Sequence, residues 1–308
     1  MKNDIFMTAD EKKSKRTLSR LILDFWLLMK PELTLLSVFT SLCSAYLAIQ
    51  IPATSQLLTF PLLALGTLLV GGGSGALNQY LEREYDAKMK RTEKRPVPDE
   101  RVSASEALIF GSFISFLGAL ILASINWLTA FLAISTLVTY IFLYTPLKRI
   151  SPLSTIIGAI PGALPTLIGW AAIQNSLSYQ SLTLFAILFY WQMPHFYSIG
   201  WLYRKDYLNA GFRFLTTVDE KGIRVSRHIL QHQIILVLVG LTPAFVGLVT
   251  VGYIPFALIV GLIFLFFGWK FSRHAGKESS GAAARMLFFS SLFYLPIIFS
   301  AMIIFKNQ

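Results

Sequence analysis

The sequence predicts an all-α polytopic membrane protein with nine transmembrane helices. Three observations lead to this fold class. The chain of 308 residues is 55% apolar and only 14% charged, whereas soluble proteins are nearer 25% charged. Nine segments have the roughly 20 mostly apolar residues that a helix needs to cross a bilayer. The Lys and Arg residues gather on alternate connections between these segments, as they do in membrane proteins.

The first 31 residues are mostly polar and are expected to lie outside the bilayer core. Leu18–Met29 is apolar but interrupted by Arg20 and Asp24, so we expect a helix in the membrane interface. Residues 32–308 form the expected membrane domain. Its predicted spans are 32–50, 57–80, 105–124, 127–146, 152–173, 180–202, 230–251, 254–272 and 285–305.

The basic residues predict the orientation of these spans. Of the 27 Lys and Arg residues, all except Lys306 fall on the N-terminal segment or on connections that alternation places on the same side. The positive-inside rule makes that side cytoplasmic, with the N-terminus inside and the C-terminus outside. The net charge of +11 therefore reflects topology and indicates no nucleic-acid partner. Two cytoplasmic connections, 81–104 and 203–229, are long, and such loops are usually functional.

The N-terminus resembles neither a secretory nor a mitochondrial targeting segment. Residues 1–20 lack the apolar run of a signal peptide, and Asp4, Asp10 and Glu11 are unusual in an acid-poor presequence. We therefore expect the plasma membrane of a bacterium. The single Cys43 excludes a disulfide within the chain.

Three polar side chains lie at the C-terminal end of the second predicted span and just beyond it. Asn78, Glu82 and Asp86 follow one another at intervals of four residues. Positions i, i+4 and i+8 drift only about 40° per step around a helix, so the three share one face. Like charges at this spacing destabilise a helix, and a carboxamide with two carboxylates suits Mg²⁺. The plain alternative is a solvated helix end before an ordinary positive-inside loop.

A dense cationic loop follows this face. Arg91, Lys94 and Arg95 suit phosphate oxygens, and Mg²⁺ commonly binds through one or two carboxylates plus substrate phosphates. We interpret residues 78–96 as the site of an isoprenoid diphosphate. The small residues 71–75, one turn earlier, indicate either close helix packing or room for the substrate.

The fifth and sixth spans carry residues that are costly in an apolar helix. Pro161 and Pro165 predict a kinked or locally opened fifth span. In the sixth span, Gln192, Pro194 and His195 call for a reason. His195 either ligates haem iron, donates a hydrogen bond, or pairs within the helix bundle.

The cytoplasmic end of the sixth span adds further candidates. Asp206 is placed to complete the Mg²⁺ site from the opposite side, while Arg204 and Lys205 are placed to reach phosphate. An interfacial belt of aromatic and basic residues is the alternative.

Two shorter patterns are less specific. In the stretch 144–149, Lys148 and Arg149 reach a diphosphate or a propionate, or serve only to orient the chain. His228 and His232 share a helix face at a spacing that can bind a metal. No acid lies between them, so an interfacial location is favoured.

Taken together, several of these stretches resemble one family. Asn78-x₃-Glu82-x₃-Asp86, ending in Arg91-Thr92-x₂-Arg95-Pro96, is similar to the first acidic motif of the intramembrane prenyltransferases, the UbiA superfamily. More narrowly, the chain resembles the branch of that superfamily that farnesylates protohaem IX. That narrower resemblance rests on residues 144–149, 157–170, 191–196 and 203–211.

The resemblance implies nine helices around a central cavity that opens to the cytoplasmic side and laterally to lipid. It implies farnesyl diphosphate and haem B as substrates, haem O and diphosphate as products, and Mg²⁺ as cofactor. Haem A synthase or oxidase assembly proteins are the implied protein partners. The implied metal ligands are Asn78, Glu82, Asp86 and Asp206; the diphosphate contacts are Arg91, Lys94, Arg95, Arg204 and Lys205; and the haem contacts are His195, Gln192, Tyr144 and Lys148.

The chain departs from the family pattern in two places. Tyr207 follows Asp206 where a further acid is common, which makes Asp219 or Glu220 a candidate substitute. Pro161 stands where relatives often have Gly. Two other functions remain open from the residues: prenylation of another acceptor, such as a quinone-precursor ring, and a transporter or assembly factor. A transporter is disfavoured because the polar cluster lies at one mouth of the bundle rather than at the midplane.

Overall fold

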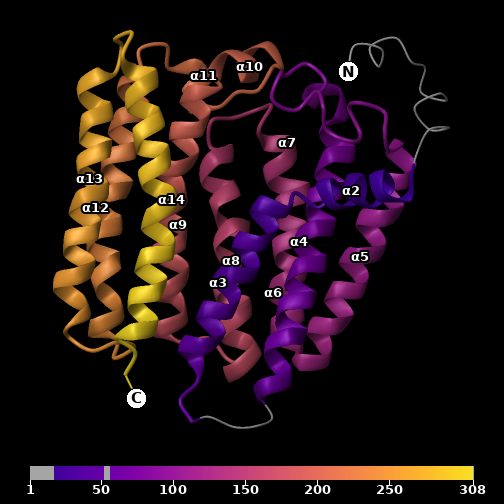
Figure 1. Ribbon diagram of the computed structural model, residues 1–308. Helices are drawn as coiled ribbons and strands as arrows, with labels where there is room; N and C mark the ends of the chain where they lie inside the picture. The colour runs from indigo at the N-terminus through magenta and orange to yellow at the C-terminus, as the bar shows by residue number, and fades with distance from the viewer. Residues whose placement is uncertain (1–16, 52–55, 308) are drawn as a thin grey trace.

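A computed structural model describes residues 17–51 and 56–307, and it is a bundle of long helices (Figure 1). Within these ranges the only β pairing is an isolated bridge between Val249 and Lys306. The long helices are α3 (Pro31–Ala48), α4 (Gln56–Asp86), α5 (Ala104–Ile125), α6 (Trp127–Val138), α8 (Ser154–Gln174), α9 (Tyr179–Leu202), α12 (Ile223–Phe245), α13 (Tyr253–His274) and α14 (Ser280–Ile304). The short ones are α2 (Leu18–Leu28), the π-helix η2 (Thr139–Tyr144), α7 (Thr145–Leu147), α10 (Arg204–Asn209) and α11 (Leu215–Val218).

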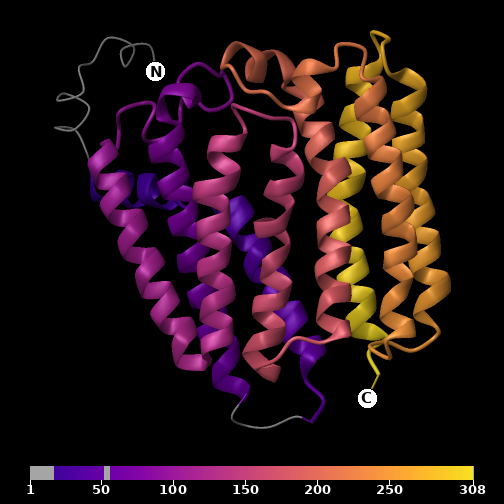
Figure 2. The same cartoon turned by 180° about the vertical axis from the view of Figure 1, so that it is seen from behind.

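The protein is a multi-pass membrane protein, as the sequence predicts. In the described ranges, 8 helices are long and apolar enough to cross a membrane, with α6, η2 and α7 counted as one. The 24-residue α9 stands among them and runs the length of the bundle (Figures 1 and 2). Helix α9 is not one of those 8, because its polar and aromatic residues lower its mean hydropathy. The ninth span therefore stays a prediction.

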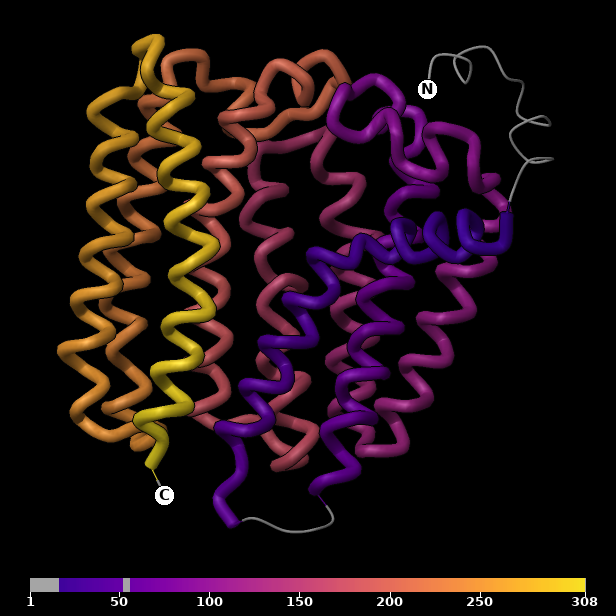
Figure 3. Tube along the Cα trace, viewed as in Figure 1, coloured from indigo at the N-terminus to yellow at the C-terminus, as the bar shows by residue number. Residues whose placement is uncertain are grey.

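The connections sort to the two ends of the bundle. The segments α7, α10 and α11 lie at one end, while the chain finishes at the other (Figure 1). Helix α2 lies across the bundle near the first of these ends (Figure 3). Its place in the membrane interface stays a prediction. The guanidinium of Arg101, in the connection after α4, holds Asp24 of α2 at 2.5 Å. Residues 1–16 lie outside the described part of the chain.

Two apolar cores meet at the middle of the bundle. One joins α9 to α12, α13 and α14, and its fully buried side chains include Ile187 and Phe299. The other joins α4, α5, α6 and α8, with Leu63 and Leu122 at its centre. Helices α3 and α8 contribute to both cores and lie between them. This position makes α8 the most buried of the candidate spans.

Five differences from the predicted spans stand out, and three of them concern helix boundaries. Helix α4 continues to Asp86, past the predicted end at residue 80. Helix α12 begins at Ile223 rather than at residue 230, because the Asp219 carboxylate accepts a hydrogen bond from the Val225 amide at 2.8 Å. It ends at Phe245 rather than at 251, just before Gly247 at φ 72°.

The remaining two differences concern helix regularity. The fourth predicted span is interrupted by the π-helix η2, whereas α8 is a continuous α-helix through Pro161 and Pro165. The fifth span is therefore not opened, and its predicted kink stays a prediction.

Lys306, the one basic residue that the described part of the chain places at the far end of the bundle, has a structural role there. Its ammonium donates to the carbonyls of Tyr46 at 2.8 Å and Ile49 at 2.6 Å, at the C-terminal end of α3. Carbonyls at a helix end lack partners within the helix, and a cation there is favoured by the helix dipole.

Candidate functional site

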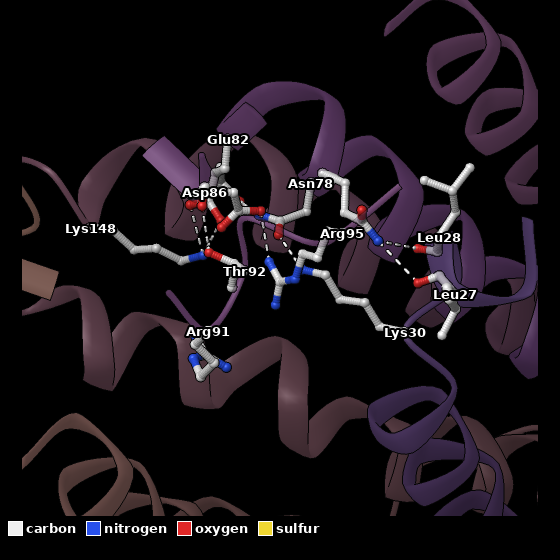
Figure 4. Close-up of polar contacts among 12 residues, drawn as sticks. Leu27, Leu28, Lys30, Asn78, Glu82, Asp86, Arg91, Thr92, Arg95 and Lys148 are labelled. Atoms are coloured by element: carbon white, nitrogen blue, oxygen red, sulfur yellow. Dashed lines mark hydrogen bonds and ion pairs between the residues drawn. The ribbon is translucent and has the colours of Figure 1, made fainter. Parts of the chain in front are cut away.

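The polar face predicted at the end of α4 exists and is deeply buried. The exposed fractions of Asn78, Glu82 and Asp86 are 0%, 6% and 1%. Figure 4 shows their side chains side by side, each meeting a different cationic residue. Buried carboxylates are costly unless they are paired, so the partners decide what this face can do.

Each of the three side chains is held by a cation from a separate element. The Lys148 Nζ lies 2.9 Å from Glu82 Oε1, and the Arg95 guanidinium lies 2.7 Å from Asp86 Oδ2. The Lys30 ammonium donates to the Asn78 carbonyl oxygen. Three segments far apart in the chain thus converge on one face of α4.

The surroundings of Lys30 and Lys148 shift the pKa values of these two lysines in opposite directions. Burial lowers the pKa of Lys30 well below its usual value, and the positive charges of Arg95 and Lys148 lower it further. Burial alone would lower the pKa of Lys148 as well, but the attraction of Glu82 outweighs it and raises that pKa. Glu82 thus favours the charged form of Lys148, whereas burial disfavours the charged form of Lys30 despite the nearby Glu82 and Asp86.

The π-helix places the groups opposite α4. Thr145 Oγ1 donates to the Tyr140 carbonyl at 2.8 Å, across the wide π turn, and accepts from Asn78 Nδ2 at 3.0 Å. This bond orients the Asn78 amide so that its oxygen faces Lys30. Single π turns inside helices occur frequently at functional sites.

An apolar cavity of about 200 Å³ lies below the acidic face. Lys30, Ser74, Tyr140 and Tyr144 line it near that face, and Gln192, His195 and Phe196 line it on α9. Its volume is below the about 300–1,000 Å³ of typical ligand pockets, so a bulky ligand must widen it.

Glycines make room for the aromatic and polar walls of this cavity. A Cβ at Gly158 would lie 2.5 Å from the Tyr144 ring, and one at Gly162 would lie 1.9 Å from Gln192 Oε1. Gln192 is held in turn, because its amide nitrogen donates to the carbonyls of Ala159 and Leu188 at 3.2 and 3.1 Å. These two positions of α8 therefore define the cavity wall.

The predicted phosphate-binding residues divide into two groups. Arg91 lies over the rings of Tyr203 and Tyr207, at 5.4 and 5.6 Å, and donates to the Tyr207 hydroxyl at 2.8 Å. It links the connection after α4 to α10, and Arg95 reaches Asp86 as described above. Both stay close to the acidic face.

The other three do not gather there. Arg204 lies over the Trp201 ring at 4.2 Å and donates to the Glu220 carbonyl. Lys94 and Lys205 are exposed. Their charges contribute to the surroundings of the cytoplasmic loops rather than to the acidic face itself.

The acids predicted on the opposite side do not form a metal cluster with the acids of α4. Among the described residues, no three His, Cys, Asp or Glu side chains are grouped closely enough to hold a metal ion, so Asp206 does not join Glu82 and Asp86 in such a cluster. Asp219 is used at the start of α12, and Glu220 is exposed. Neither serves as a substitute in this conformation.

The histidines have distinct surroundings. His195 lines the cavity, and its Nδ1 lies 2.8 Å from Ser291 Oγ of α14. His228 and His232 stack at 6.0 Å, and the Nδ1 of His232 lies 2.6 Å from the backbone carbonyl of His228. The described residues near this pair include the rings of Tyr190 and Tyr197, and no acid joins it in a metal cluster.

Sequence reasoning missed Lys30 and gave Lys148 a different partner. Lys30 has no predicted role, but its backbone φ of 49° places it at the start of α3, beside the acidic face. The ion pair of Lys148 with Glu82 was not predicted, and its contact with haem or a diphosphate stays a prediction. A basic residue next to Pro31 at the mouth of the bundle was the available signal for Lys30.

The sequence and the fold both match known proteins. The profile of the UbiA prenyltransferase family matches residues 37–292. The protoheme IX farnesyltransferase of Solibacter usitatus is 41% identical, with 91% of this chain and 98% of that protein covered. The protoheme IX farnesyltransferase of Koribacter versatilis is 39% identical, with 92% and 93% covered.

Solved structures share the fold at lower identity. A UbiA homologue from Archaeoglobus fulgidus, bound to GPP and Mg²⁺, superposes with a TM-score of 0.67 at 15% identity, over 91% of this chain and 99% of that one. A digeranylgeranylglyceryl phosphate synthase gives a TM-score of 0.74 at 14% identity, over 92% and 97%. On the family profile and on these near full-length relatives, the chain belongs to the UbiA prenyltransferase family.

Proposed function

We propose that this prenyltransferase moves a farnesyl group from farnesyl diphosphate to a vinyl group of haem B, forming haem O and diphosphate. The acceptor follows from the relatives, which are protoheme IX farnesyltransferases about 40% identical over nearly their whole lengths. The observation that carries the prenyl chemistry is the buried face of Asn78, Glu82 and Asp86 at the mouth of an apolar cavity.

The residues of this face fit Mg²⁺. Carboxylate and amide oxygens are the ligands that Mg²⁺ takes, together with substrate phosphates. The proposed protein ligands are Asn78, Glu82 and Asp86, with Asp206 approaching from α10 when the loops close over the substrate. Bound there, the metal would neutralise charge that develops on the leaving diphosphate.

The cations now paired with this face are suited to the same leaving group. Lys30, Arg95 and Lys148 each hold one oxygen-bearing side chain. With those oxygens engaged by Mg²⁺, Lys30, Arg95 and Lys148 would be free to meet phosphate oxygens, and Arg91 would join them from the loop. Such preset charges are usually the largest single contribution to catalysis.

The reaction balances as follows. The bond between C1 of the farnesyl group and the diphosphate oxygen breaks, and its electron pair leaves with the diphosphate. The terminal vinyl carbon bonds to C1, and the hydroxyl of one water adds to the other vinyl carbon while its proton is released. The apolar cavity walls, including Tyr140 and Tyr144, keep other water away from the allylic cation and stabilise it by cation–π attraction.

The remaining assignments complete this proposal. Residues 32–308 form one catalytic domain in a bacterial plasma membrane, with the acidic face and the N-terminus on the cytoplasmic side. Haem A synthase or an oxidase assembly protein is the proposed recipient of the product.

A reconstitution of the purified protein tests this function. We expect haem B, farnesyl diphosphate and Mg²⁺ together to yield a haem whose mass has increased by a farnesyl group and one hydroxyl group. A product that appears only with an aromatic quinone precursor would exclude haem as the acceptor. Absence of diphosphate release with every acceptor would exclude prenyl transfer itself.

A further inference from the structure

His195 packs against two aromatic rings at the edge of the cavity. The Trp191 ring stacks on it with a centroid distance of 5.1 Å and an angle of 20°. Phe288 of α14 covers it at 5.3 Å and 33°. With a ring fixed in this way, the position of each imidazole nitrogen is determined by the surrounding helices.

The neighbouring serine determines which nitrogen carries the proton. Ser291 Oγ donates its only hydrogen to the Phe288 carbonyl at 2.5 Å. It therefore has no hydrogen left for His195 Nδ1, which lies 2.8 Å away. The bond is satisfied only if Nδ1 carries a proton and donates it to Ser291. Trp191 Nε1 donates to the Ser291 carbonyl at 2.8 Å and holds the serine in place.

The other nitrogen is left with its lone pair. In a neutral ring protonated on Nδ1, Nε2 is an acceptor. No described residue forms a hydrogen bond with it, and the ring lines the cavity with Gln192, one turn earlier on α9. An imidazole whose other nitrogen donates to an oxygen is the usual form of a metal-ligating histidine.

We propose that Nε2 of His195 is an axial ligand of the iron of the haem substrate, and that Ser291 positions it by fixing its tautomer. This inference rests on the proposed function, in which haem is the acceptor. The bond is a dative one from a lone pair that is already free, so no proton has to leave. It would fix the centre of the porphyrin against α9 and give α14 a part in acceptor binding.

Binding of ferric haem b to the purified protein in detergent, without farnesyl diphosphate, tests the proposal. We expect the wild-type absorption and electron paramagnetic resonance spectra to show a nitrogen ligand. His195→Ala should lose this signature and bind haem at least about tenfold more weakly, and added imidazole should restore the signature. Ser291→Ala should weaken haem binding by about 10–100-fold, the effect usual for an outer partner of a metal ligand.

His274→Ala is the matched control, because His274 lies at the end of α13 with its Nδ1 2.7 Å from the Lys270 carbonyl, and its spectrum should be that of the wild type. His195→Gln keeps a polar side chain at this position, so it tests the ligand assignment even if His195→Ala fails to fold. An unchanged spectrum and affinity in both His195 variants would overturn the ligand assignment. Unchanged binding in Ser291→Ala would overturn the positioning role.

The haem-binding result is separable from that of the farnesyl transfer assay. If the wild type forms haem O while His195→Ala binds haem as the wild type does, only the ligand assignment fails. If the wild type releases diphosphate only with another acceptor and does not bind haem, the proposed function fails with it.

Discussion

Lys148 holds both carboxylate oxygens of Glu82, with its Nζ at 2.9 and 3.1 Å from them. Both side chains are less than a tenth exposed, so neither charge has an alternative partner in water. The same lysine lies over the Tyr144 ring at 4.3 Å. This pair therefore serves the stability of the bundle and the charge of the acidic face together, and the two roles can be separated by experiment.

The first prediction separates them. Glu82→Gln and Lys148→Met should each destabilise the protein by about 3–5 kcal/mol, because each leaves a buried charge unpaired. The double variant should regain much of this loss, since no charge remains. Unfolding in detergent measures the stability, and product formation should be lost in all three variants. A double variant no more stable than the single ones would contradict the pairing.

The second prediction concerns the proposed metal face. Asp86→Asn should lower kcat by about 10²–10³-fold, the effect of losing one electrostatic partner of a transition state. Glu84→Gln is the control, because Glu84 is on the same helix but is 75% exposed and pairs with Arg83 at 3.5 Å. Equal activity of the two variants would remove Asp86 from the site.

The third prediction concerns the cavity wall. Gly162→Ala should reduce both stability and activity, since its Cβ would overlap Gln192, and such overpacking costs about 1–3 kcal/mol. Gly281→Ala on α14 meets nothing within 4 Å and should change neither. Thermal unfolding and kcat of the two variants, measured side by side, decide the matter. Wild-type behaviour of Gly162→Ala would show that Gln192 is free to move away.

The fourth prediction concerns the loop arginine. Arg91→Met should raise the KM for farnesyl diphosphate about tenfold, because hydrogen bonds to charged groups contribute about 1.5–3 kcal/mol. Arg91→Lys should restore little, since an ammonium lacks the planar fork of a guanidinium. Tyr207→Phe removes only the hydroxyl that Arg91 contacts and should have a smaller effect. An unchanged KM in Arg91→Met would place this arginine outside the substrate site.

The fifth prediction concerns the far end of the bundle. Lys306→Met should lower stability by about 0.3–1 kcal/mol, because the last carbonyls of α3 lose a cation. Lys277→Met, an exposed residue in the turn between α13 and α14, should leave stability unchanged. Thermal unfolding of the two variants in one detergent compares them. The same melting temperature for both would argue against this role of Lys306.

The sequence predicted what depends on regular periodicity. The helical repeat was enough to place Asn78, Glu82 and Asp86 on one face, and hydropathy was enough for the membrane class. Neither could reveal η2, because the π turn depends on the contacts of Thr145 with Tyr140 and Asn78, which lie on different elements. The contact between Lys30 and Asn78 was hidden for the same reason.

The loop residues were the hardest to assign. Arg91 and Arg204 both lie in long connections and next to other basic residues in the sequence. Arg91 links two elements beside the acidic face, whereas Arg204 faces Trp201 and the Glu220 carbonyl. These different contacts depend on the path of the backbone around α10. The amino-acid composition does not reveal that path.

The contact between Lys306 and the end of α3 joins the last described turn of the chain to the first of the long helices. Helix α14 also packs its Phe299 ring near Phe39 of α3. During synthesis, α3 emerges before the other long helices. Its terminal carbonyls therefore lack the Lys306 ammonium until the final residues have been made. The packing of α3 is thus completed only when α14 has been made. A chain that stops before α14 leaves α3 without this neighbour.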